Sequence, residues 1–378
     1  MKCIDEIPAS ELRGKRVLVR AGLDLSLTES GEVVDFFRVQ KACPTLEYLK
    51  NAGARTIILN HIGRDPEISD EPVARALKRY LPVVFIPDLT GAIAQHAVQS
   101  IKDGEIALLE NLRRDPREKS NDEGFARELA AFGDIYVNDA FSAIHRAHAS
   151  MVGVPNFLPH YAGLLVRDEI KQLEQARHPE APSFAILGGA KFETKAPLIQ
   201  SLLNTYDHLF IAGALANDVF KARGMEVGVS LISKELPSAD ILNNPHFLAP
   251  ADVTVERPNK QALVKKPQEV GADERIVDIG PDSIAQIAPL IAEAKFILWN
   301  GPTGLYEAGY VAYTHSIAEL ISKAVANGAK AVIGGGDTIA AIQESGIPED
   351  SLGFLSTGGG AMLEYLLKGT LPGIEALK

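Results

Sequence analysis

Basic side chains recur in the loops that follow the predicted strands in the first half of the chain. They stand in the segments NHIGR, ENLRR and HRAHAS and at the start of a helix-like stretch: Arg38, His61, Arg64, Arg113 and Arg146. Arginine forks bind phosphate and carboxylate oxygens through paired hydrogen bonds, so several of them directed at one point would hold a small polyanion. A compact phosphorylated acid is the ligand that fits this set.

Local pairing is the alternative for each of these side chains. Arg113 could pair with Glu110 or Asp115, because most surface charges are solvated or weakly paired. The histidines, His148 above all, could be structural groups that bond to the backbone. Repetition at four strand ends favours a shared binding site over four independent pairs.

Glycine-rich loops take the corresponding positions in the second half. Their sequences are GGAKFETK (residues 188–195), NGPTGLYE (300–307), GGGDT (334–338) and STGGGA (356–361). Glycines at a strand-to-helix turn let backbone N–H groups approach phosphate oxygens, and the N-terminus of the following helix adds partial positive charge. These loops favour a nucleotide phosphate site.

Charged side chains within these loops suggest how phosphates would be held. Asp337 follows three glycines, where a carboxylate could hold Mg²⁺ bridging two phosphates. Alternatively, Asp337 caps a helix that begins near Thr338. Lys191 and Lys195 lie four residues apart, so they would share one face if the turn enters a helix there, and both could reach a phosphate chain.

Several classes of function are disfavoured. The motifs of P-loop nucleotide hydrolases, dinucleotide-binding dehydrogenases, serine hydrolases and zinc proteases are absent. The net charge of −11 argues against a general nucleic-acid or anionic-membrane binder. No apolar run approaches a membrane span, and Cys3 and Cys43 form no redox or zinc motif, so we expect a cytoplasmic protein.

The elements that must position these loops alternate between short β-branched runs and longer helical segments, which is typical of the α/β class with parallel sheets. The predicted strands of the first half are residues 16–20, 56–60, 83–87, 106–110 and 135–138. Those of the second half are residues 184–187, 208–212, 252–255, 296–299, 331–333 and 354–356. Two sheets of similar size follow, with ligand loops at their carboxyl ends.

A charged segment, RDEIKQLEQAR at residues 167–177, separates the two halves. Its apolar positions Ile170 and Leu173 are spaced for one helix face, which predicts a helix joining two domains. An ordinary surface helix of one domain is the alternative.

The order of the blocks DIYVNDAF, HRAHAS, AILGGAK, WNGP, GGGD and STGGGA resembles the phosphoglycerate kinase family, and the similarity runs from RVLVR to LPGIEAL. The resemblance implies two Rossmann-like domains, residues 1–166 and 179–359, joined by a helix at 167–178 and a hinge, with residues from about 360 to 378 packing back onto the first domain. It implies reversible glycolytic phosphoryl transfer between 1,3-bisphosphoglycerate and MgADP, giving 3-phosphoglycerate and MgATP. A hinge-closing protein needs no partner to complete its cleft, so we expect a monomer.

The resemblance also implies roles, by motif match. The five basic residues named first would bind the phosphoglycerate together with Asp24. Arg38, Lys191, Gly358 and Gly359 would act on the transferred group, and Asp337 would hold the metal. The nucleotide would contact Gly189, Lys191, Lys195, Gly213, Asn300, Pro302, Glu307, Gly335, Gly336, Asp337 and Thr338.

Some positions depart from the family pattern. After RVLVR the family reads Val-Asp-Phe-Asn-Val-Pro, so here Gly22 replaces the aspartate and Asp24 the asparagine, two side chains that help hold the glycerate end. On the nucleobase side, Ala212 and Ala214 replace the first and third glycines of the family's triple-glycine turn, and Ile276 replaces a further glycine. The added side-chain atoms would narrow or reshape the pocket for the base. Smaller changes fall at Ser142, Ala143 and Thr303.

Three hypotheses follow. The retained arginines, Lys191, Lys195 and Asp337 favour an active phosphoglycerate kinase. The departures at Gly22 and Asp24 would suit a non-catalytic ligand-binding protein. A third possibility keeps the enzyme and changes the phosphorylated acid or the nucleotide.

Overall fold

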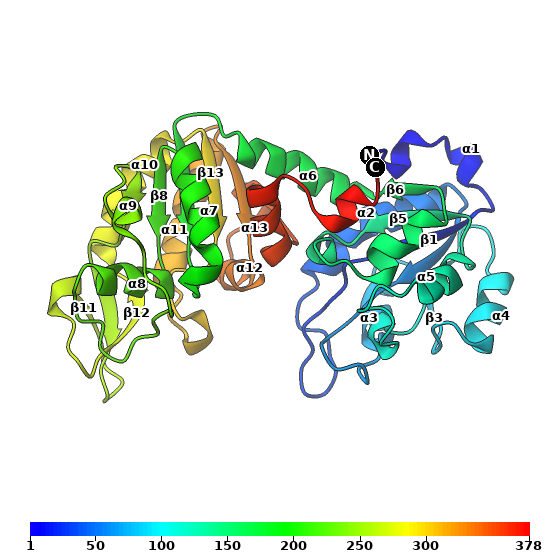
Figure 1. Cartoon of the computed structure of the whole chain (residues 1–378), viewed down its shortest axis with the longest axis horizontal. Coiled ribbons are helices and arrows are strands. Elements are labelled where there is room, and N and C mark those ends of the chain that lie inside the picture. Colours follow the sequence, from blue (N-terminus) through cyan, green and yellow to red (C-terminus); the bar gives the residue numbers. More distant parts are fainter. The chain divides into compact units, whose positions relative to one another are not determined.

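The computed structural model describes all 378 residues. The chain divides into two compact units, Met1–Lys171 with Thr370–Lys378 and Gln172–Gly369. Each unit contains its own six-stranded sheet, in which every pairing is parallel (Figure 1). The α/β class with two parallel sheets is therefore confirmed.

The sheet of the first unit has the order β3-β4-β2-β1-β5-β6. Its strands are β1 (Arg16–Ala21), β2 (Arg55–Leu59), β3 (Val83–Phe85), β4 (Ile106–Leu108), β5 (Ile135–Asp139) and β6 (His160–Ala162). Its helices are α1 (Ala9–Leu12), α2 (Phe37–Asn51), α3 (Glu71–Leu77), α4 (Ala92–Ser100), α5 (Glu123–Ala130) and α14 (Pro372–Glu375). After β4 the chain crosses to the other side of β1, so β1 and β5 flank the point where open α/β sheets bind ligands.

Strand β1 shows why these residues form a buried parallel strand. Val17, Leu18 and Val19 are apolar on both faces of the sheet and almost fully buried. Helix α2 covers the strand with Val39 and Leu46, which belong to the same core. Because the strand is packed on both faces, it fixes the position at which the following loop begins.

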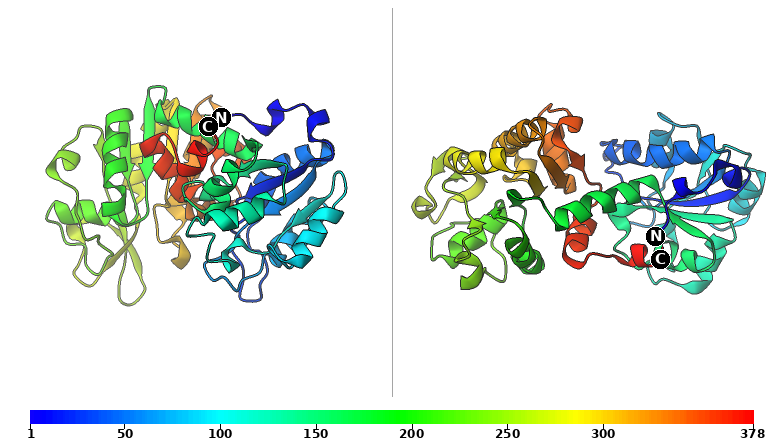
Figure 2. Two further views of the ribbon diagram at one scale, coloured as in Figure 1. Left: turned by 45° about the vertical axis from the view of Figure 1, so that its right-hand side comes forward. Right: turned by 90° about the horizontal axis from the view of Figure 1, so that it is seen from above.

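The sheet of the second unit has the order β15-β14-β13-β7-β8-β9. Its strands are β7 (Ser183–Leu187), β8 (His208–Ile211), β9 (Phe247–Leu248), β13 (Phe296–Asn300), β14 (Lys330–Gly334) and β15 (Phe354–Leu355). The helices are α7 (Phe192–Thr205), α8 (Ala214–Ala222), α9 (Ala239–Leu242), α10 (Pro281–Glu293), α11 (Ala312–Ala326), α12 (Gly336–Gln343) and α13 (Gly359–Lys368). Helices α7 and α11 lie on opposite faces of this sheet (Figures 1 and 2).

The strand predicted at residues 252–255 does not belong to this parallel sheet. It forms β10 (Val253–Glu256), the centre of a separate three-stranded antiparallel sheet with β11 (Ala262–Lys265) and β12 (Arg275–Ile279). A short β-branched run reads the same in either kind of sheet, which is why its partners were not predictable. Val253 and Val255 pack instead into a small core with Phe220.

Helix α6 (Leu164–Arg177) contains the boundary between the two units, which falls between Lys171 and Gln172. The segment that returns to the first unit begins at Thr370 rather than near residue 360. The reason is that α13 stays with the second unit, where it packs against α7. None of the helices has the length and apolar character that crossing a membrane requires.

Candidate active site

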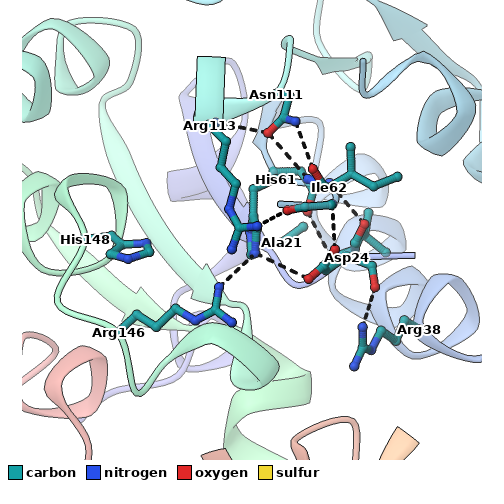
Figure 3. A network of polar contacts seen from close by, with 12 residues as sticks. Ala21, Asp24, Arg38, His61, Ile62, Asn111, Arg113, Arg146 and His148 are labelled. Carbon is teal, nitrogen blue, oxygen red and sulfur yellow. Dashed lines mark hydrogen bonds and ion pairs between the residues drawn. The ribbon is translucent and has the colours of Figure 1, made fainter. Parts of the chain in front are cut away.

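Loops from the carboxyl ends of three strands converge on His61 in the first unit (Figure 3). His61 follows β2, Arg113 lies in a 3₁₀ turn (Leu112–Arg114) after β4, and Arg146 follows β5. Arg146 Nη1 lies 3.4 Å from His61 Nε2, and the Asp24 carboxylate lies 3.7 Å from the same atom. The predicted convergence of basic groups from separate loops is present.

Arg113 does not pair with Glu110 or Asp115, which was the alternative interpretation. Glu110 is paired with Arg114 and Asp115 with Arg117, at 3.7 Å and 2.7 Å, whereas Arg113 forms an ion pair with neither. Its side chain donates to the Gly63 carbonyl, and its buried Nε has no partner. Burial, aided by nearby Arg146, lowers the pKa of this guanidinium. A buried cation with a free N–H indicates a site for an anion.

The remaining basic residues differ in their surroundings. The Arg38 side chain extends from α2 and donates to the Asp24 carbonyl, while Arg64 is exposed after β2. His148 Nδ1 lies 3.8 Å from a Glu118 carboxylate oxygen, and burial lowers the pKa of His148 to about 4. The neighbour of His148 is therefore a buried carboxylate and not the backbone group that the structural interpretation supposed.

Arg20, which was not predicted, supports the cluster from beneath. It is fully buried in β1, its Nη2 lies 2.7 Å from His61 Nδ1, and its Nε donates to Ser150 Oγ at 2.9 Å. Ser150 in turn donates to the buried Glu118 carboxylate from its hydroxyl and from its backbone N–H, at 2.6 Å and 2.9 Å. Arg20 and Glu118 thus compensate one another through Ser150. The one available signal was an arginine inside an apolar strand.

The contact from Arg20 sets the tautomer of His61. A guanidinium only donates hydrogen bonds, and guanidinium groups lie at both ring nitrogens, Arg20 at 2.7 Å from Nδ1 and Arg146 at 3.4 Å from Nε2. The shorter contact from Arg20 is the stronger hydrogen bond, so it makes Nδ1 the acceptor and leaves the ring proton on Nε2. Burial, followed by the charges of Arg20, Arg113 and Arg146, lowers the pKa of His61 well below its ordinary value. His61 is therefore a neutral donor whose Nε2–H faces the other groups of the cluster.

A long-range ¹H–¹⁵N correlation spectrum tests this tautomer. We expect the neutral Nε2–H pattern for His61 to persist as the pH is lowered through about 6.5, where an unperturbed imidazole titrates. His160 is an internal reference with the opposite tautomer, because its Nδ1 lies 3.0 Å from the Pro155 carbonyl and must donate. A His61 signal that titrates near pH 6.5, or that shows Nδ1–H, would contradict the assignment.

Asp24 is held in the cluster by backbone contacts. Its carboxylate accepts from the Gly63 N–H at 2.8 Å, and the neighbouring Leu23 exchanges hydrogen bonds of 2.9 Å and 3.2 Å with the Asn60 side chain. The carboxylate therefore has a fixed place beside His61, although 34% of the Asp24 side chain is exposed. Any anion bound here shares the site with one resident negative charge.

In the second unit the loops at residues 188–195 and 300–307, together with Asp337, α8 and β12, line a cavity of about 300 Å³. The loops approach one another so closely that only glycine fits: a Cβ on Gly213 would lie 2.7 Å from the Gly189 nitrogen, and one on Gly301 would lie 2.4 Å from the Gly188 carbonyl carbon. Both positions also have positive φ. Five predicted nucleotide residues line the cavity: Gly189, Gly213, Pro302, Glu307 and Asp337.

The other predicted nucleotide residues lie outside the cavity wall: Lys191, Lys195, Asn300, Gly335, Gly336 and Thr338. Lys195 donates to the Gly188 carbonyl at 3.0 Å, and Thr338 accepts from the Gly301 N–H at 2.8 Å, so both hold the glycine loops. Burial lowers the pKa of Lys195, and the charge of Asp337 opposes that shift.

The expectation that Lys191 and Lys195 share a helix face is wrong. Helix α7 begins at Phe192, and Lys191 precedes it with φ of 66°. This left-handed residue turns the chain before the helix starts. Lys191 is exposed at that turn and Lys195 is partly buried in the helix.

Of the three positions on the nucleobase side that depart from the family pattern, two line the cavity and one does not. Ala214 and Ile276 line the cavity, whereas Ala212 is fully buried and does not. Asp278 also lines it; burial raises its pKa to about 7 against the hydrogen bond from Thr303. The wall at Ile276 thus carries a branched side chain beside a buried carboxyl.

Asp337 is not the helix cap that was the alternative interpretation. The cap position of α12 is Gly335, and Asp337 lies exposed in the first turn, where its carboxylate accepts from the Tyr306 hydroxyl at 3.4 Å. One accessible carboxylate at the rim of the cavity suits Mg²⁺, which takes its other ligands from phosphates and water. Asp337 therefore fits the metal.

The first turn of α13 presents backbone donors at a loop that was predicted to face the transferred group. The N–H of Gly358 is already engaged by Ser356 Oγ at 3.1 Å, which leaves those of Gly359 and Gly360 as the first donors of the helix. No side chain of the protein fills the space at Gly360. The positive end of the helix dipole adds to the attraction for an anion.

A parallel α/β unit with a converging cationic site, together with a second unit whose glycine loops enclose a cavity, defines a phosphotransferase of small anionic substrates. Residues 5–369 match the family model described as phosphoglycerate kinase. The phosphoglycerate kinase of Moorella thermoacetica is 41% identical over 97% of this chain and 97% of its own, and that of Mycobacterium ulcerans is 40% identical over 99% and 95%.

Solved structures of this family are also similar. Phosphoglycerate kinase from Pyrococcus horikoshii superposes with a TM-score of 0.88 at 27% identity, covering 100% of this chain and 98% of its own. The structure from Coxiella burnetii gives 0.79 at 33% identity, covering 99% and 97%. The chain belongs to the phosphoglycerate kinase family and is a glycolytic phosphotransferase.

Proposed function

We propose that this chain catalyses the reversible, Mg²⁺-dependent transfer of a phosphoryl group between 1,3-bisphosphoglycerate with ADP and 3-phosphoglycerate with ATP. The observation that carries the assignment of the acceptor site is Arg113, a buried guanidinium that forms no ion pair with Glu110 or Asp115 and whose Nε has no partner. It follows β4 and Arg146 follows β5, the next strand along the chain, yet both side chains lie near His61 (Figure 3). Such a group is costly unless a ligand anion completes it.

The first unit supplies the phosphoglycerate site. Arg64, Arg113 and Arg146 neutralise the non-transferred phosphate, and His61 donates from Nε2 to an oxygen of the ligand. The Asp24 carboxylate orients the glycerate end of the substrate by accepting a hydrogen bond from the hydroxyl of the glycerate. Arg38 is placed to stabilise charge that develops on the transferred group, where a positioned donor lowers the barrier more than it tightens ground-state binding.

The second unit supplies the nucleotide site. The cavity beside Gly213 and Ile276 takes the base, Glu307 the ribose, and the glycine loops the phosphates. Asp337 holds Mg²⁺, which when bound neutralises charge between the phosphates. Lys191 and the first N–H groups of α13 contact the transferred phosphoryl group, and Lys195 fixes the loop beneath.

Transfer requires the donor and acceptor oxygens to be in contact, so we propose that the two units close around the substrates during turnover and exclude water that would compete as acceptor. Such a protein needs no second copy, which supports a monomer that acts on small molecules alone. The free cysteines Cys3 and Cys43 support a reducing, cytoplasmic location.

A coupled assay with Mg²⁺, ATP and 3-phosphoglycerate tests this function. We expect turnover that Asp337→Ala abolishes, with Asp350→Ala, a change outside the candidate sites, as the matched control. A panel of nucleotides in the same assay reads the effect of Ile276 on base preference. Turnover of the wild type no greater than that of Asp337→Ala would refute the assignment.

A further inference from the structure

Gly22 lies where a larger residue would have to displace the side chain of Ser142. It follows β1, and a Cβ placed on it would lie 2.9 Å from Ser142 Oγ and 3.2 Å from the Ala140 Cα. Real Cβ atoms almost never make contacts as short as the first. Since Gly22 is not among the residues with positive φ, the requirement for glycine here comes from space and not from backbone conformation.

Ser142 occupies that space from the neighbouring strand. It lies in the 3₁₀ turn Phe141–Ala143 that follows β5, and β5 pairs with β1 so that Ala21 stands opposite Asp139. The two segments therefore leave the sheet side by side at the point where the strand order reverses, which is the ligand position in folds of this kind. The same loop carries Arg146 four residues later.

The hydroxyl of Ser142 is available to a ligand. The side chain is partly exposed and forms no hydrogen bond with the rest of the protein. A hydroxyl can donate to a carboxylate and accept from an alcohol, which are the two groups at the glycerate end of the substrate. Being neutral, it adds no negative charge to a site that already contains Asp24.

We propose that Ser142 contacts the glycerate end of the substrate and replaces the side chain that Gly22 lacks, so that the two positions form a compensating pair. This inference rests on the proposed function. It assigns to a neutral hydroxyl on the β5 loop the contact that the family places on an acidic side chain after β1.

Kinetics of Ser142→Ala test the contact. We expect the KM for 3-phosphoglycerate to rise roughly tenfold or more, because a hydrogen bond to a charged ligand is lost, while the KM for MgATP stays unchanged. Ser142→Thr, which keeps the hydroxyl, should retain most of the affinity. Ser100→Ala, at the exposed end of α4, is the control. An unchanged KM for 3-phosphoglycerate in an active Ser142→Ala enzyme would overturn the proposal.

A double-mutant cycle tests the pairing without relying on activity. Gly22→Asp should lower the melting temperature in the presence of Ser142, and Gly22→Asp combined with Ser142→Gly should recover much of that loss and bind 3-phosphoglycerate in calorimetry. Additive effects of the two changes on melting temperature would overturn the pairing. Absence of transfer in the wild type would instead count against the proposed function. The double-mutant cycle would still test the pairing, because melting temperatures and binding can be measured without transfer.

Discussion

Replacing Arg38 by alanine is expected to lower kcat for 3-phosphoglycerate phosphorylation by about 10²–10³-fold, the usual cost of removing one donor that stabilises transition-state charge. The Arg38 guanidinium is partly buried, donates to the Asp24 carbonyl and forms no ion pair with an acidic side chain. Its charge is therefore oriented but not neutralised by the protein.

The loss should fall on kcat more than on the KM for phosphoglycerate, because Arg113 and Arg146 remain to bind the ground state. The kcat of Arg38→Lys should lie between those of the wild type and Arg38→Ala, since an ammonium keeps the charge but not the planar fork. Arg75→Ala is the matched control: Arg75 also lies in the first unit, but it pairs with Glu71 on the surface of α3 at 3.3 Å. A kcat for Arg38→Ala within about tenfold of the wild type would contradict the role, because that corresponds to only about 1.4 kcal/mol.

Replacing Glu118 by alanine is expected to lower the free energy of unfolding by about 3–5 kcal/mol, the range for removing one partner of a buried charge pair. Glu118 and Arg20 are 1% and 0% exposed, and both bond to the buried Ser150. Burial lowers the pKa of Arg20, and the charge of Glu118 opposes that shift. Without Glu118, the buried guanidinium loses its principal counter-charge.

Chemical unfolding by urea measures this change. Glu123→Ala is the control, because Glu123 pairs with Arg127 at 2.8 Å on the exposed face of α5, where such a pair is worth at most about 1 kcal/mol. Glu118→Gln should cost less than Glu118→Ala, since the amide can still accept from Ser150. Equal stability of the Glu118→Ala and Glu123→Ala variants would show that the buried network does not hold the cluster together.

The sequence predicted the two parallel sheets because their strands are short apolar runs between helical segments, and such runs are distinctive in α/β chains. It misplaced residues 252–255, since an antiparallel strand with the same β-branched residues looks identical in isolation. The edge strands β6 and β9 of the parallel sheets and the partners of β10, strands β11 and β12, were also missed.

The basic site was predictable for a different reason. Arg113 and Arg146 stand in the loops that directly follow predicted strands, where ligands bind in open α/β sheets. Arg20 was missed because it interrupts an apolar strand and its meaning depends on Glu118 and Ser150, which are distant in sequence. The crowding at Gly22 comes from residues about 120 positions away, so no local pattern could reveal it. Lys191 was misjudged because the start of α7 depends on a left-handed residue that the sequence does not mark.

Trapping of the acyl phosphate is the most direct test of the central claim, that this chain phosphorylates the carboxylate of 3-phosphoglycerate. Hydroxylamine converts an acyl phosphate into a hydroxamate and leaves phosphate esters intact. We predict a hydroxamate of 3-phosphoglycerate that requires Mg²⁺, ATP and the wild-type enzyme together and that falls sharply with Arg38→Ala. Binding of both substrates by calorimetry with no hydroxamate above the enzyme-free background would contradict the claim.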